Sequence, residues 1–110
     1  MRLTYKRWRR AHRVFCRVLN HYGSHPTTDP ELILIYDTNF KKVRWGWYQD
    51  GEVGVNFARC KDWEEVVGTI VHEVWHHLQD PKRTDKKRYE KEAKAVAKRD
   101  APLFLAEMTR

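Results

Sequence analysis

Hydrophobic residues recur every three or four positions in two parts of the chain, which predicts two amphipathic helices. The first is expected over residues 4–21, with Thr4 as its N-cap and Gly23 as its stop. The second is expected over residues 62–79, with an Asp62–Glu65 capping box before it and Asp80-Pro81 after it. The two apolar stripes contain Trp8, Ala11, Phe15, Val18, Leu19 and Tyr22 in the first helix, and Trp63, Val66, Val67, Ile70, Val71, Val74, Trp75 and Leu78 in the second.

Between these helices the pattern changes to that of three short strands. Leu32–Tyr36 is continuously apolar, which predicts a strand buried on both faces. The next two strands are half-buried and separated by Asp50-Gly51, a pair typical of tight hairpin turns. Their alternating apolar positions are Val43, Trp45 and Trp47, and then Val53, Val55 and Phe57.

A last helix is expected from Thr84 or Asp85 to about residue 100, with Pro102 marking its end. The element order α-β-β-β-α-α predicts an α+β domain whose small sheet, antiparallel or mixed, packs on helices with the 62–79 helix in the centre. We therefore expect one domain over residues 1–110. Its parts are a basic amphipathic helix (1–23), a three-stranded sheet (31–59), the central helix (62–79), a further helix (85–100) and a C-terminal segment (101–110).

Composition favours a small, self-contained domain with a basic surface. The chain has 110 residues, five Trp and nine other aromatic residues, which supply bulky core material. No apolar run approaches a membrane span, and no secretory signal is recognisable, so no membrane contact is expected. Cys16 and Cys60 are isolated, which favours a reducing cytoplasm. A monomer is expected.

The positive charge is unevenly distributed. The net charge is +7, and the first acidic residue, Asp29, follows seven Arg or Lys residues. Such a surface attracts nucleic acid or acidic protein segments, and Arg7, Arg10 and Arg13 are the candidate contacts.

The residues with the clearest chemistry are His72-Glu73-Val74-Trp75-His76, an H-E-x-x-H motif in the second helix. Residues four apart share one helix face, so the two histidines can bind a single metal ion. Glu73 lies one step round the helix, where it can act on a metal-bound water. A third ligand is expected from the last helix, which offers Glu90 and Glu92, because His77 points about 100° away from His76.

With Glu90-Lys91-Glu92-Ala93 following on the next helix, the chain resembles the gluzincin-type zinc metallopeptidases. These include the minigluzincins and the repressor-cleaving and radiation-response metallopeptidases of bacteria and phages. The resemblance implies a minimal zincin-like fold and Zn²⁺ held by His72, His76 and Glu90, with Glu92 as the alternative third ligand. Lys94 stands where such proteins often carry an Asp or Asn that orients a histidine.

The resemblance also implies a zinc-activated water that attacks a peptide bond, with Glu73 as general base. Tyr89 or His77 would help to polarise the carbonyl. A peptide or protein substrate of an endopeptidase would pair with the edge strand above the metal, expected at Val53, Gly54, Val55, Asn56 and Phe57. The apolar segment after Pro102 would pack on the core, or fold over the cleft and inhibit.

The alternative is a nucleic-acid-associated protein with a structural or degenerate zinc site. A protease recruited to DNA through Arg7, Arg10 and Arg13 would combine both functions. Glu73 discriminates between a catalytic and a structural site, because a structural site needs ligands but no general base.

Overall fold

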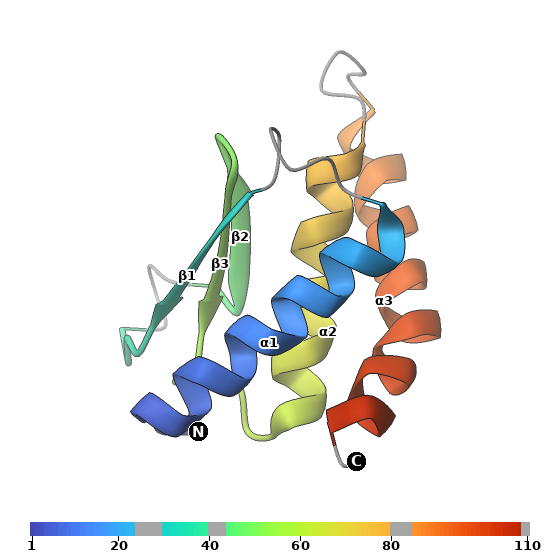
Figure 1. Ribbon diagram of the computed structural model, residues 1–110. Coiled ribbons are helices and arrows are strands. Elements are labelled where there is room, and N and C mark those ends of the chain that lie inside the picture. The colour runs from blue at the N-terminus through green and yellow to red at the C-terminus, as the bar shows by residue number, and fades with distance from the viewer. Residues whose placement is uncertain (24–29, 40–43, 80–84, 109–110) are drawn as a thin grey trace.

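Three helices and a three-stranded sheet follow one another in the order α-β-β-β-α-α, as the sequence predicts. The computed structural model describes residues 1–23, 30–39, 44–79 and 85–108. The elements are α1 (Tyr5–Tyr22), β1 (Glu31–Ile35), β2 (Gly46–Gln49), β3 (Glu52–Asn56), α2 (Trp63–Leu78) and α3 (Lys86–Met108). Figure 1 shows α2 between the sheet and α3, with α1 crossing in front. Predicted features that lie outside the described residues are Val43, Asp80, Pro81 and Thr84.

Each helix begins at a side-chain cap. Thr4 Oγ1, Asp62 Oδ1 and Asp85 Oδ1 each accept a hydrogen bond from the backbone N–H three residues ahead, at 3.2, 3.0 and 3.1 Å. Gly23 ends α1 in the left-handed conformation, with φ of 72°. These local signals confirm the predicted starts of α1 and α2 and select Asp85 as the start of α3.

The sheet is mixed, with the strand order β1-β3-β2. β2 and β3 are antiparallel and joined by Asp50-Gly51, whose positive φ values of 49° and 77° fit the tight hairpin turn predicted there. β1 runs parallel to β3, with Leu32 opposite Val53. This arrangement makes β3 the central strand and leaves β1 and β2 at the edges.

The prediction that Val53–Phe57 is an edge strand open to a substrate is therefore wrong. Val53–Phe57 cannot receive a further strand, because β1 and β2 occupy the two hydrogen-bonding edges of β3. The Asn56 side chain is also engaged: its Oδ1 accepts hydrogen bonds from the N–H of Asp37 and Ala58, and its Nδ2 donates to Asp37 O. The edge strand that contacts α2 is β2.

β1 is less buried than its apolar sequence predicts. Only Leu32 is buried, whereas Ile33, Leu34 and Ile35 are half-buried. Among the described elements the helices all lie on one side of the sheet, so the other face of this edge strand has no covering layer (Figure 1). A continuous apolar run could not distinguish this strand from one buried on both faces.

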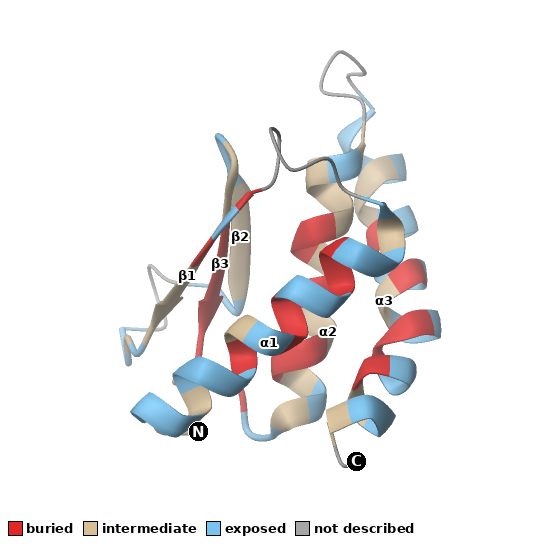
Figure 2. Cartoon of the chain, viewed as in Figure 1, coloured by how far each residue is buried: buried red, intermediate tan, exposed pale blue. Residues whose placement is uncertain are grey.

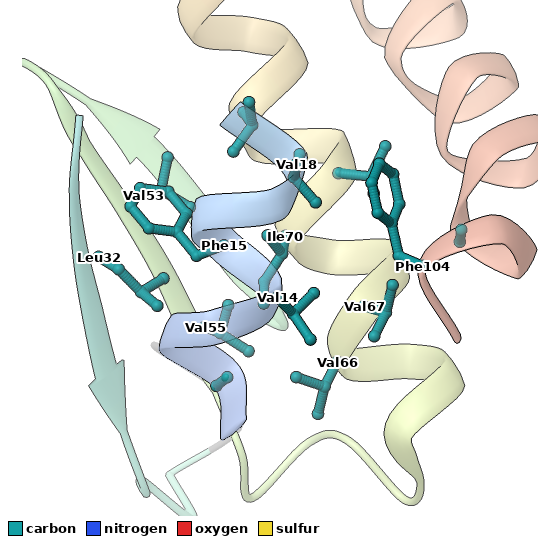
Figure 3. Packing of buried hydrophobic residues seen from close by; sticks show 14 of the residues in the cluster. Val14, Phe15, Val18, Leu32, Val53, Val55, Val66, Val67, Ile70 and Phe104 are labelled. Carbon is teal, nitrogen blue, oxygen red and sulfur yellow. The ribbon is translucent and has the colours of Figure 1, made fainter. Parts of the chain in front are cut away.

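The hydrophobic core fills the space between the sheet and the three helices. Figure 3 shows Val18, Ile70 and Val53 converging there from α1, α2 and β3, and each of them is fully buried. Trp8 was expected in the same stripe of α1 but is 42% exposed, because the first turns of α1 extend to the edge of the molecule (Figure 2).

The last helix does not end at Pro102. α3 continues to Met108 and thus joins the helix predicted over residues 85–100 to residues 101–108 of the segment predicted separately as 101–110. A proline inside a helix removes one backbone hydrogen bond, at about 3 kcal/mol. Ala101 and Phe104 are only 6% and 2% exposed, and their burial offsets that cost. The C-terminal segment therefore packs on the core and does not fold over the site.

No helix in the described parts of the chain is both long enough and apolar enough to cross a membrane.

Gly46 allows β2 to lie directly against α2. A Cβ at Gly46 would lie 2.3 Å from Thr69 Cγ2 and 2.6 Å from the carbonyl oxygen of Gly54. A Cβ at Gly68, within α2, would meet no atom of the described residues within 4 Å beyond its chain neighbours and its own helix backbone. Of these two glycines, only Gly46 is therefore needed for the close packing of β2 on α2.

We expect Gly46→Ala to lower the free energy of unfolding by about 1–3 kcal/mol, because strand and helix must separate. Gly68→Ala, the matched control, should raise it by about 0.5–1 kcal/mol by favouring the helix. Urea denaturation of both variants measures the two effects. Unchanged stability of Gly46→Ala would contradict the described packing.

Candidate metal centre

The two histidines of the H-E-x-x-H motif lie on one face of α2. Their Nε2 atoms are 3.2 Å apart. One ligand atom from each of His72, Glu73 and His76 lies within 4.8 Å of the others, so these residues are close enough to hold a metal ion. The helical spacing alone brings them together, as the sequence predicts.

α3 brings Glu90 to the two histidines. Its Oε1 lies 2.8 Å from His72 Nε2, and its Oε2 lies 3.0 Å from His76 Nε2. Two ligands of a tetrahedral zinc ion, each about 2.0–2.1 Å from the metal, are separated by about 3.3 Å. The three side chains thus have nearly the spacing of ligands to one ion.

Glu92 does not reach the histidines. Its Oε1 accepts hydrogen bonds from Trp75 Nε1 at 2.7 Å and from Gln79 Nε2 at 3.3 Å. Of the two glutamates that the sequence leaves open, Glu90 therefore has the position expected of a third ligand. Glu92 connects α3 to the C-terminal end of α2.

Gln79 orients His76, which sequence reasoning missed. Its Oε1 lies 2.7 Å from His76 Nδ1, and its Nε2 donates to Tyr89 O at 3.0 Å. An amide oxygen only accepts hydrogen bonds, so His76 Nδ1 carries the proton and Nε2 presents a lone pair. This is the role that the resemblance assigns to the position of Lys94, which is exposed here. The available signal was a Gln one helical turn after the second histidine.

The donor atoms fit a divalent cation. With its Nδ1 facing Gln79, His76 presents Nε2 toward the carboxylate of Glu90. Burial lowers the pKa of His72 even though the charge of Glu90 opposes this, which favours the neutral form of His72. Lone pairs that converge at 2.8–3.2 Å repel one another unless a proton or a cation lies among them.

Glu73 is buried beside this cluster. Its side-chain Oε1 is 3.9 Å from His72 Nε2, and within the described part of the chain its buried Oε2 has no hydrogen-bond partner. Burial raises the pKa of Glu73 to about 7, with nearby His76 and Arg44 opposing the shift and Glu90 adding to it. A cation in the cluster would favour the carboxylate form of Glu73. The position of Glu73 therefore suits a carboxylate that lies beside a bound metal ion.

A cavity of about 440 Å³ opens beside Glu73 between α2, α3 and β2. Tyr48, from β2, and His77 line it, with the tyrosine hydroxyl 2.8 Å from His77 Nδ1. Tyr89 lines it as well, so both residues expected near the reacting carbonyl are at the cavity. Tyr48 was not foreseen, because its strand pattern carried no sign of chemistry. The remaining lining residues are Arg44, Gly46, Trp47, His76, Gln79, Lys86 and Glu90.

The predicted nucleic-acid contacts lie elsewhere. Arg7, Arg10 and Arg13 line a separate groove on α1, together with Trp63 from the first turn of α2. The structure therefore brings together His72, Glu73, His76 and Glu90, and it does not bring the arginines to them.

Comparison with known proteins finds no family model, no curated protein and no solved structure that matches this chain.

Replacing Gln79 with Leu removes the acceptor that fixes the His76 tautomer. We expect Gln79→Leu to weaken binding of a divalent ion, with Zn²⁺ as the probe, about 10- to 100-fold, the usual effect of losing an outer hydrogen bond to a ligand histidine. Titration against a chromogenic zinc chelator measures the affinity. Gln49→Leu, at an exposed position on β2, is the control and should bind like the wild type. Equal affinity of both variants would show that Gln79 does not orient the ligand.

Proposed function

We propose that this protein is a zinc-dependent peptidase of the endopeptidase type. The observation that carries the proposal is the convergence of two imidazole nitrogens and one carboxylate beside Glu73, a buried residue at an open cavity whose Oε2 has no hydrogen-bond partner among the described residues. A structural zinc site is usually closed by four Cys or His ligands. Here two histidines and one carboxylate converge, and the remaining side fits a water and a substrate.

In this proposal His72, His76 and Glu90 hold the zinc ion. Bound zinc lowers the pKa of a coordinated water to near neutrality and polarises a carbonyl oxygen. The supporting residues keep the ligands in position: Gln79 holds the His76 ring, and Glu92 accepts a hydrogen bond from the Gln79 amide.

Glu73 is the proton carrier of the proposed reaction. Its Oε2 has no hydrogen-bond partner among the described residues and would accept the proton of the attacking water, and burial, which raises the pKa of Glu73, helps the carboxyl group to hold that proton against the opposing effect of a nearby cation. Glu73 then gives the proton to the amine nitrogen that leaves when the peptide bond breaks.

In this proposal the substrate lies along the edge of β2 that pairs with no other described strand, which we call the open edge. β2 borders the cavity through Gly46, Trp47 and Tyr48, and its other edge pairs with β3. An extended peptide that adds to the open edge would make backbone hydrogen bonds and cross the cavity beside Glu73. This replaces β3 as the substrate strand. In this proposal a substrate carbonyl accepts a hydrogen bond from Tyr48, His77 or Tyr89, which line the cavity.

Zinc stoichiometry of the purified protein tests the ligand set. We expect one zinc ion per chain in the wild type, loss of most zinc in Glu90→Gln, and retention in Glu92→Gln, because only Glu90 contacts the histidines. Elemental analysis after exhaustive dialysis measures the content, and the two isosteric variants serve as each other's control. Loss of zinc in Glu92→Gln with retention in Glu90→Gln would reverse the assignment.

Glu73→Gln separates catalysis from metal binding. The amide cannot take up a proton, so we expect hydrolysis of dye-quenched casein to fall about 100- to 10,000-fold while zinc content stays at the wild-type level. Glu64→Gln, an exposed position on the same helix, should leave both properties unchanged. Peptidase activity that persists in Glu73→Gln would exclude its role as general base.

A further inference from the structure

A strongly basic groove lies on α1, at the other end of α2 from the metal centre. It has a volume of about 560 Å³. We call it the basic groove, and its lining residues are Thr4, Lys6, Arg7, Arg9, Arg10, Arg13 and Trp63. The guanidinium group of Arg10 stacks 5.6 Å above the ring of Trp63, which joins the groove to the first turn of α2.

No carboxylate of the described residues pairs with the positive charges of this groove. Within the described part of the chain, Lys6, Arg9, Arg10 and Arg13 form no ion pair with a carboxylate, and α1 pairs through Arg17 with Glu107, outside the groove. The outward face of α1 is exposed along most of its length (Figure 2). Cations this close together repel one another, so a bound polyanion would relieve their repulsion.

Two aromatic rings stand in solvent beside the groove. Tyr5 and Trp8 are 73% and 42% exposed, and their rings are stacked with centroids 6.1 Å apart and planes 10° from parallel. The His12 ring packs against the Trp8 ring, with the two ring centroids 4.0 Å apart. The core does not use these rings, although large exposed aromatic surfaces are unfavourable in water.

The aromatic rings and the cations belong to adjoining hollows. A second hollow of about 280 Å³ is lined by Leu3, Thr4, Tyr5 and Trp8, and Thr4 is also a wall of the basic groove. A ligand with an anionic backbone and flat apolar groups attached to it would fill both hollows at once.

We propose that this face of α1 binds single-stranded nucleic acid, with phosphates in the basic groove and a base stacked on the exposed rings of Tyr5 and Trp8. Single-stranded chains present the faces of their bases to aromatic side chains, whereas duplexes keep those faces stacked inside. An acidic peptide would use the arginines but offers no flat group to stack on the exposed parts of these rings, which inside the protein contact Arg9 and His12. Arginine is also suited to phosphate, because its planar donors bind two oxygens together.

The proposed surface is separate from the metal centre. Trp63 and His72 are nine residues apart on α2, which corresponds to about 13 Å along the helix axis. Binding of nucleic acid therefore does not depend on zinc or on peptidase activity, and substitutions at one site are expected to leave the other intact. Failure of either proposal does not affect the other.

Fluorescence anisotropy with a dye-labelled twelve-nucleotide oligothymidine tests stacking. We expect the full chain to bind this probe at low salt, and Trp8→Leu to bind it about tenfold more weakly, because Leu keeps an apolar contact but offers no ring. Trp45→Leu is the control, since Trp45 is 49% exposed but lies outside both hollows. Equal affinity of the Trp8 and Trp45 variants would overturn the proposed stacking.

The salt dependence of the same binding tests the phosphate contacts. For single strands the slope of log K against log salt changes by about 0.7 for each phosphate contact. The double variant Arg10→Gln/Arg13→Gln should therefore flatten the slope by about 1.4. Lys91→Gln/Lys98→Gln removes the same charge from exposed positions on α3 and should leave the slope unchanged. Equal slopes for the two double variants would overturn the proposal.

Competitors identify the class of ligand. We expect unlabelled oligothymidine to displace the probe at lower concentration than either a duplex of equal length or polyglutamate of matched charge. Equal displacement by the duplex would mean that base faces are not recognised. Equal displacement by polyglutamate would assign the surface to acidic protein segments and overturn the nucleic-acid proposal.

Discussion

The packing of α3 against α2 is the contact on which the candidate metal centre depends. The two helices run in opposite directions, so the start of α3 lies beside the end of α2 (Figure 1). Ala93 is fully buried and Val96 is 6% exposed, and these small side chains let the backbones approach closely. Glu90, one turn before Ala93, then reaches both histidines. A shift of one residue along α3 would turn Glu90 away by about 100° and dismantle the cluster.

The sequence predicts those features of the fold that depend only on residues close together along the chain. Helix caps, the hairpin turn and the shared face of His72 and His76 all follow from spacings of a few residues. Strand order does not follow from such spacings. β1 pairs in parallel with β3, and no local pattern indicates which strand becomes central. The prediction that the last helix ends at Pro102 was wrong for a similar reason. α3 continues beyond Pro102 because Phe104 is buried, and that burial is a tertiary effect. Gln79 and Tyr48 acquire their roles only through the fold.

Glu73 and the basic face of α1 share one physical property, since in each case the fold maintains a charge pattern that stability alone would not favour. A buried carboxylate oxygen without a hydrogen-bond partner costs folding free energy, as do crowded cations and exposed rings. Such conflicts between local chemistry and stability concentrate at functional sites. The core around Val53, Ile70 and Val18 shows no comparable conflict (Figure 3).

The central claim is that two imidazoles and one carboxylate of this chain bind zinc. Zinc X-ray absorption spectroscopy of the metal-loaded protein tests it most directly, because the spectrum reports the atoms around the ion. The account predicts nitrogen and oxygen neighbours at about 2.0–2.1 Å, with outer scattering from two imidazole rings. Sulfur neighbours at about 2.3 Å, or no imidazole scattering, would contradict the assignment of His72, His76 and Glu90.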